Sequence, residues 1–106
     1  MKWVRSAFWV GRAKDGEEAH LRRAVDTDLV PRLRTFPGVH TVKALWPRSR
    51  EDSPPDIFCQ VIVEFDDRNG LDRMLASNER KATRPLVHDL ASRFDGTISH
   101  IDFEVG

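Results

Sequence analysis

A row of apolar side chains at every second position near the middle of the sequence constrains the fold more than any other feature. Every second residue from Ile57 to Phe65 is apolar, which is the period of a β-strand with one buried face. The chain has 106 residues, and a chain of that size has room for one hydrophobic core. We therefore expect a single domain, residues 1–106, built around a strand over residues 56–65.

Three other segments have the character of strands. Aromatic and β-branched side chains predict strands over residues 2–11, 39–47 and 97–105. Residues 48–55 are polar or proline and predict an exposed hairpin connection. Asp95-Gly96 predicts the turn that leads into the last strand.

Apolar residues recur with helical spacing between the first and second predicted strands and between the third and fourth, which predicts helices in both segments. Asp15 and Glu18 have the spacing of a capping box and predict the start of the first helix. Pro31 lacks a backbone donor and predicts a kink or a break near Val30, and Pro37-Gly38 ends the helix. Polar capping residues predict two further helix starts, at Asp66-Asp67 and at Ser77.

The resulting order, βαββαβ, is that of a ferredoxin-like α+β fold with an antiparallel sheet and helices on one face. In strand one we expect Val4, Phe8 and Val10 beneath the helices. The other face would then be rich in aromatic and apolar groups, and exposure of such a face to water is unfavourable. A second copy of the chain is the expected cover, so we predict a homodimer. The side chains assigned to that face are Trp3, Arg5, Trp9, Phe58, Gln60, Ile62 and Glu64.

Three short stretches resemble the EthD-like branch of the dimeric α/β barrel proteins. They are residues 29–39, with a proline-leucine pattern followed by Pro37-Gly38-Val39, then Phe65-Asp66-Asp67, then Ser77-Asn78-Glu79. The resemblance spans nearly the whole chain and implies a dimeric α/β barrel that takes small hydrophobic molecules. The family's histidine in the first stretch corresponds to Leu29 here, so a role that depends on that histidine does not carry over.

Two function classes follow from this resemblance. The first is a protein of catabolic or secondary metabolism that acts as a cofactor-independent oxygenase or isomerase on an aromatic or lactone substrate. The second is a non-catalytic ligand-binding or accessory protein of a degradation pathway, which Leu29 favours. A structural dimerisation module without a cavity is a third possibility, and the presence of a concave pocket separates it from the others.

Two histidines are the catalytic candidates. His100 shares a strand face with Asp102 and can act as an acid or base, although a solvated edge strand would place the same residues together. His20 can face a cleft or solvent. The substrate-binding candidates are Arg5, Trp9, Gln60 and Trp46.

Arg5 and Trp9 would project into the same space and could hold an aromatic or anionic ligand. In the alternative interpretation, Arg5 pairs with Glu64 inside the dimer interface and Trp9 fills that interface.

Charge and cysteine content exclude several classes of function. The chain carries 17 basic and 17 acidic residues, so we expect neither a nucleic-acid partner nor a membrane partner. The N-terminus lacks the pattern of a secretory signal, and the lone Cys59 allows no internal disulfide, so we expect a cytoplasmic protein. We expect no metal and no cofactor, because the histidines lack ligand spacing and no phosphate-binding loop occurs. We interpret Arg80, Lys81 and Arg84 as a solvated helix face.

Overall fold

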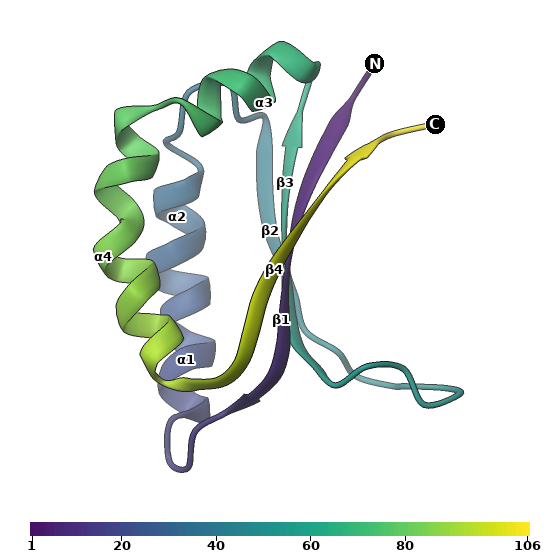
Figure 1. Ribbon diagram of the computed structural model, residues 1–106, viewed down its shortest axis with the longest axis vertical. Coiled ribbons are helices and arrows are strands. Elements are labelled where there is room, and N and C mark those ends of the chain that lie inside the picture. Colours follow the sequence, from purple (N-terminus) through teal and green to yellow (C-terminus); the bar gives the residue numbers. More distant parts are fainter.

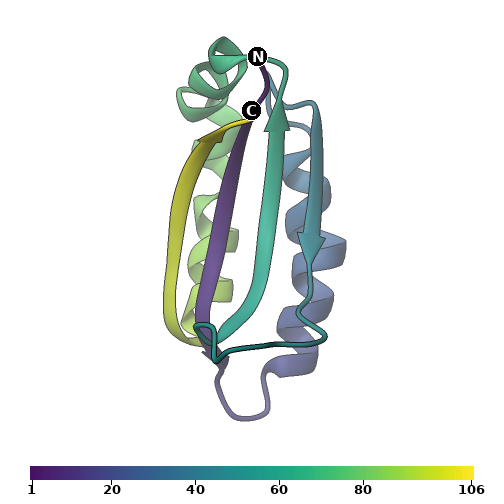
Figure 2. The same cartoon turned by 90° about the vertical axis from the view of Figure 1, so that its right-hand side faces the viewer.

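Four antiparallel strands form one sheet, and all the helices cover the same face of it. The computed structural model describes all residues 1–106. The strands are β1 (Trp3–Ala13), β2 (Thr41–Leu45), β3 (Ile57–Phe65) and β4 (Phe94–Glu104), in the order β2-β3-β1-β4 across the sheet. The helices lie to one side of the sheet in Figure 1, and Figure 2 looks onto its other, bare side. The predicted ferredoxin-like α+β fold is confirmed.

The first crossover is one continuous helix with a wide turn in its middle. It consists of α1 (Glu18–Ala24), the π-helical turn η1 (Val25–Leu29) and α2 (Val30–Leu33). The backbone N–H of Val30 donates to the carbonyl of Val25, five residues earlier. The distortion predicted at Pro31 therefore takes the form of a wide turn before the proline, and the helix does not break.

The predicted capping box at the start of this helix is wrong. The residue before α1 is Glu17, and no side chain caps the helix there. The Glu17 carboxylate instead forms an ion pair with Arg93, with 3.1 Å between the nitrogen and oxygen atoms. This pair joins the start of the first helix to the residue that follows α4.

The second crossover contains two helices with side-chain caps at both predicted starts. In α3 (Arg68–Leu75), the Asp67 carboxylate accepts a hydrogen bond of 3.0 Å from the Gly70 N–H. In α4 (Asn78–Ser92), the Ser77 hydroxyl accepts one of 3.1 Å from the Arg80 N–H. Such caps satisfy donors that have no partner within the helix. The Ser77 cap fixes where α4 begins. Helix α4 carries Arg80 and Arg84.

The face assignment of β1 made from the sequence is wrong for most of the strand. Trp9 pairs with Cys59 and Arg5 pairs with Val63 in the β1–β3 register, so Arg5, Trp9 and Trp3 share the helix-covered face with the buried alternates of β3. Trp9 is only 1% exposed. Because successive residues of a strand point to opposite faces, Phe8, Val4 and Val10 lie on the bare side.

Phe58 also lies on the side opposite to the predicted one. The register shifts between Trp9 and Val10, so that Val10 pairs with Ile57. This irregularity turns the Phe58 ring toward the Phe94 ring of the core, with 5.6 Å between the ring centroids. Gln60, Ile62 and Glu64 remain on the bare side, as expected.

The two longest strands approach each other closely near the start of β4. Gly11 of β1 pairs with Gly96 of β4, and both have positive φ angles, +132° and +153°. A Cβ atom at either position would collide with the backbone of the other strand. Asp95-Gly96 is therefore part of β4, and the turn predicted there is wrong.

The bare side of the sheet, which we call the helix-free face, carries both apolar and polar side chains. Near its centre the Gln60 amide donates a hydrogen bond of 2.6 Å to the Ser6 hydroxyl. Leu45, Ile101 and Phe103 are 42%, 48% and 43% exposed. The strand registers place the following apolar side chains on this face: Val4, Phe8, Val10, Leu45, Ile62, Ile101 and Phe103.

Candidate functional site

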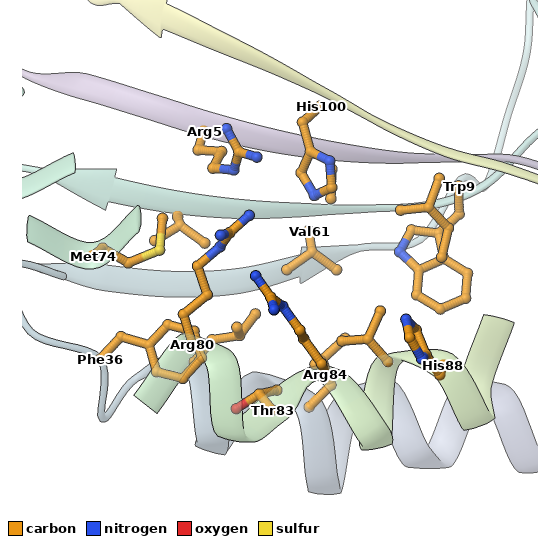
Figure 3. Close-up of a pocket in the computed structure, with 16 residues that line it drawn as sticks. Arg5, Trp9, Phe36, Val61, Met74, Arg80, Thr83, Arg84, His88 and His100 are labelled. Atoms are coloured by element: carbon orange, nitrogen blue, oxygen red, sulfur yellow. The ribbon is translucent and has the colours of Figure 1, made fainter. Parts of the chain in front are cut away.

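A cavity of about 240 Å³ lies between the helix-covered face of the sheet and the helices. Ala7, a small residue of the central strand β1, lines it between Arg5 and Trp9. Figure 3 shows labelled lining side chains that come from the sheet, from α3 and α4, and, for Phe36, from the segment after α2. The apolar part of the lining consists of Ala7, Trp9, Leu29, Leu33, Phe36, Val61, Val63, Met74, Val87 and Ile98.

Nitrogen-bearing side chains form the polar part of the lining. They come from three elements: Arg5 from β1, His100 from β4, and Arg80, Arg84 and His88 from α4. Thr83 is the remaining lining residue, and none of the lining residues is aspartate or glutamate. The cavity therefore combines apolar walls with a basic side, an arrangement that can take a molecule with an apolar body and a polar end.

Arg5 has a carboxylate partner. Asp102 lies opposite Arg5 in the β1–β4 register, and one guanidinium nitrogen of Arg5 donates to both Asp102 oxygens, at 2.9 and 3.1 Å. The side chains are 17% and 31% exposed. This ion pair holds the Arg5 guanidinium in place, and it replaces the Arg5–Glu64 pair considered from the sequence.

The α4 arginines lack such partners. Arg80 donates a hydrogen bond to the Leu75 carbonyl at 3.4 Å, and neither Arg80 nor Arg84 forms an ion pair. Burial lowers the pKa of the Arg80 guanidinium, and the positive charges of Arg5 and Arg84 lower it further. The basic side chains are thus close enough to repel one another.

His100 lies opposite Ala7 in the register of β1 and β4. Partial burial lowers the pKa of its imidazole below 6.5, the charges of Arg5 and then Arg80 lower it further, and Asp102 offsets part of the shift. The imidazole is therefore mainly neutral at pH 7. A neutral imidazole can accept a proton.

The structure brings together three of the six side chains proposed from the sequence. Arg5, Trp9 and His100 line the cavity, although Arg5 and Trp9 do so from the face opposite to the one predicted. The other three lie outside it. His20 is on α1, and Gln60 is on the helix-free face.

Trp46 belongs to a separate group beyond the end of β2. Its indole N–H donates to the Asp26 carboxylate at 3.1 Å, and the Arg22 guanidinium lies 4.6 Å from the ring centroid. The indole also packs edge-on against Phe58. These contacts account for Trp46 without a ligand.

Sequence reasoning missed the contribution of α4. Arg80, Arg84 and His88 follow one another at intervals of four residues, which places them on one helix face. That spacing was visible in the sequence and could have identified them. Of the three residues interpreted as a solvated helix face, Lys81 is exposed and does not line the cavity, Arg84 is exposed but also lines the cavity, and Arg80 is half-buried in the lining.

Cys59 and the acidic and histidine side chains form no second candidate site. Cys59 is fully buried, and burial, with a smaller effect from Asp26, raises the pKa of its thiol to about 12, so it packs and does not act as a nucleophile. No group of three or more His, Cys, Asp or Glu side chains could hold a metal ion. No helix has the length and apolar character needed to span a membrane.

Comparison with known proteins identifies the fold. The sequence matches no family model and no curated protein. Among solved structures, an EthD-family protein from Bacillus halodurans superimposes with a TM-score of 0.78 at 14% identity, covering 100% of both chains. The chain has the ferredoxin-like fold found in an EthD-family protein.

Two further structures share this fold. SnoaB, a cofactor-independent oxygenase from Streptomyces nogalater, matches with a TM-score of 0.64 at 19% identity, over 98% of this chain and 91% of SnoaB. A dimeric protein of unknown function from Bacteroides fragilis matches with a TM-score of 0.67 at 9% identity, over 98% of this chain and 96% of that one. At these identities the likeness establishes the fold alone.

Proposed function

We propose that the cavity binds a small, largely apolar molecule of catabolic or secondary metabolism and that His100 removes a proton from it. The observation that carries this proposal is a neutral imidazole beside an apolar cavity and next to the Arg5 guanidinium. A base in this position can take a proton from a carbon atom next to a carbonyl group. The neighbouring guanidinium stabilises the oxyanion of the resulting enolate.

The proton transfer begins either of two reactions. The electron pair of the broken C–H bond remains on the substrate as the enolate. In an isomerisation, the proton returns to another carbon of the conjugated system. In an oxygenation, O₂ is the oxidant: a CH₂ group becomes a carbonyl containing one oxygen atom, and the other oxygen leaves as water with the two hydrogens. The fold shared with SnoaB, a cofactor-independent oxygenase, supports the second route.

Deuterium exchange tests this proposal without knowledge of the natural substrate. The probe is 2-tetralone, a two-ring ketone with acidic C–H bonds between its carbonyl and its ring. In D₂O, NMR should show exchange at this carbon that is faster with the protein than with buffer. The exchange rate with the variant His100→Gln should be on the order of 100-fold lower than with wild type, which is typical for removal of a general base.

His20→Gln is the matched control, because His20 lies outside the cavity and the substitution is chemically the same. It should exchange 2-tetralone at the wild-type rate. Equal rates for wild type and His100→Gln would show that His100 is not the base, and the proposal would then be wrong.

A specific observation favours a second function, ligand binding without turnover. Leu29, at the position that resembles the histidine of the EthD-like family, lines the cavity and is 4% exposed. An apolar side chain there adds to the binding surface but can transfer no proton. If 2-tetralone binds without accelerated exchange, this second function is the correct one.

We also propose that the protein is a homodimer that joins two helix-free faces. Apolar side chains on both central strands and on the edge strand β4 make this face suitable for a second copy. The fold match to a protein described as dimeric adds support. A location in the cytoplasm is proposed as well, since the single thiol of Cys59 has no disulfide partner in the chain.

A further inference from the structure

The basic side of the cavity contains three arginines, two of them on neighbouring turns of α4. Arg80 and Arg84 extend from successive turns of α4 toward the sheet, where Arg5 and His100 face them (Figure 3). Positive charges four residues apart on a helix repel each other and reduce its stability. The arrangement therefore costs the folded protein some stability.

The protein does not neutralise these charges itself. Asp102 pairs with Arg5, and this leaves Arg80 and Arg84 without a carboxylate partner. Arg93, at the other end of α4, shows the contrast, because Glu17 and Asp89 both pair with it. The cavity lining supplies no acidic residue. Two guanidinium groups thus remain available beside an apolar space.

We infer that the ligand of this cavity carries a carboxylate, held between Arg80 and Arg84, on an apolar ring system that fills the space beneath. Planar guanidinium groups bind carboxylates through paired, charge-assisted hydrogen bonds. A cavity of about 150 Å³ is enough for benzene, so the 240 Å³ found here accepts two fused rings. This inference rests on the proposed function for the existence of the ligand site and adds the ligand's charge.

A matched pair of probes tests the charge separately from the cavity. The probes are 2-naphthoate and 2-naphthamide, which share a ring system and differ in charge, and calorimetry measures their affinities for the full chain. The carboxylate should bind wild type at least tenfold more tightly than the amide. The ratio of the two affinities should fall to about two or less in the double variant Arg80→Gln/Arg84→Gln. A third probe, 2-naphthyl phosphate, distinguishes a carboxylate site from a phosphate site. It should bind wild type more weakly than 2-naphthoate does.

Lys81→Gln is the control variant, because Lys81 is an exposed cation on the same helix outside the cavity. It should keep the wild-type ratio. The single variants Arg80→Gln and Arg84→Gln should each reduce the ratio, and they serve if the double variant does not fold. Circular dichroism checks the folding of each variant.

The outcomes separate the two proposals. Equal affinities of wild type for 2-naphthoate and 2-naphthamide, or an unchanged ratio in the arginine variants, would overturn the charge inference and leave the cavity proposal intact. Tighter binding of 2-naphthyl phosphate would overturn the carboxylate assignment. Failure of both naphthalene probes to bind at millimolar concentration would overturn the ligand site itself, and the charge inference with it.

Discussion

His100 has a charged neighbourhood that sets its proton affinity. Arg5 and Arg80 lower the pKa of its imidazole, in addition to partial burial, and Asp102 raises it. In the unfolded chain the imidazole has its ordinary pKa of about 6.5. Between the folded and unfolded values the unfolded state binds more protons, so the free energy of unfolding falls as the pH decreases through this range. His100→Gln should remove this part of the pH dependence.

Substitutions near His100 should move its pKa in opposite directions. Arg80→Gln removes a positive charge, so the pKa of His100 should rise toward 6.5. Asp102→Asn removes the compensating negative charge, so the pKa should fall further. NMR titration of the imidazole ring protons measures both changes, and a pKa that stays constant in both variants would contradict the described environment.

The sequence predicts the chemical role of a side chain better than it predicts which other side chains lie beside it. The sequence predicts an ion-binding group at Arg5, an aromatic surface at Trp9 and a base at His100, and all three side chains line one cavity. The sequence also predicts Gln60 on the same face as Arg5, yet the two lie on opposite faces. A shift of one residue in strand facing exchanges every neighbour of a side chain, and local sequence does not determine that shift when both faces are apolar.

The strands differ in how clearly their sequences indicate which face is buried. In β3 the alternation predicted the buried face correctly from Cys59 to Phe65, but not at Ile57, which lies beyond the register shift and pairs with Val10 of the helix-free face. In β1 aromatic residues occur at successive positions, Phe8 and Trp9, so period two is not resolved. Pairing with β3 decides the facing, because Trp9 must lie on the same side as its partner Cys59. Which face of β1 is buried is therefore determined by its pairing with β3.

The helices were easier to place than their internal geometry was. Ser77 and Asp67 predicted helix starts because a side-chain oxygen can satisfy free backbone donors. Pro31 predicted a disturbance but not its form, since either a kink or a wide turn relieves the clash with the preceding turn. The wide turn that occurs ends at Leu29, a residue that lines the cavity.

For the whole molecule, the expectation of a dimer survives the corrected facing of β1. Both faces of β1 are rich in apolar groups, so turning the strand over exchanges Trp3 and Trp9 for Val4 and Phe8 on the helix-free face. The expected interface consequently consists of different side chains from those first assigned to it. Trp9 belongs to the core of each subunit.

Sedimentation of wild type should give twice the chain mass of 12.2 kDa at micromolar concentration. Ile101→Glu places a charge on the helix-free face, at a side chain that is 48% exposed, and should yield monomers because burial of an unpaired charge is costly. Lys81→Glu, on the exposed side of α4, should remain dimeric. A monomeric wild type would refute the dimer.

The proposed ligand site lies between the sheet and α4. Methyl-resolved NMR during titration with 2-tetralone tests it most directly, since methyl groups report each face of the sheet separately. We expect shifts at the cavity methyls of Ala7, Val61 and Val87, with no shifts at Ile62 and Ile101 on the helix-free face. Shifts confined to Ile62 and Ile101, or no shifts at saturating 2-tetralone, would contradict it.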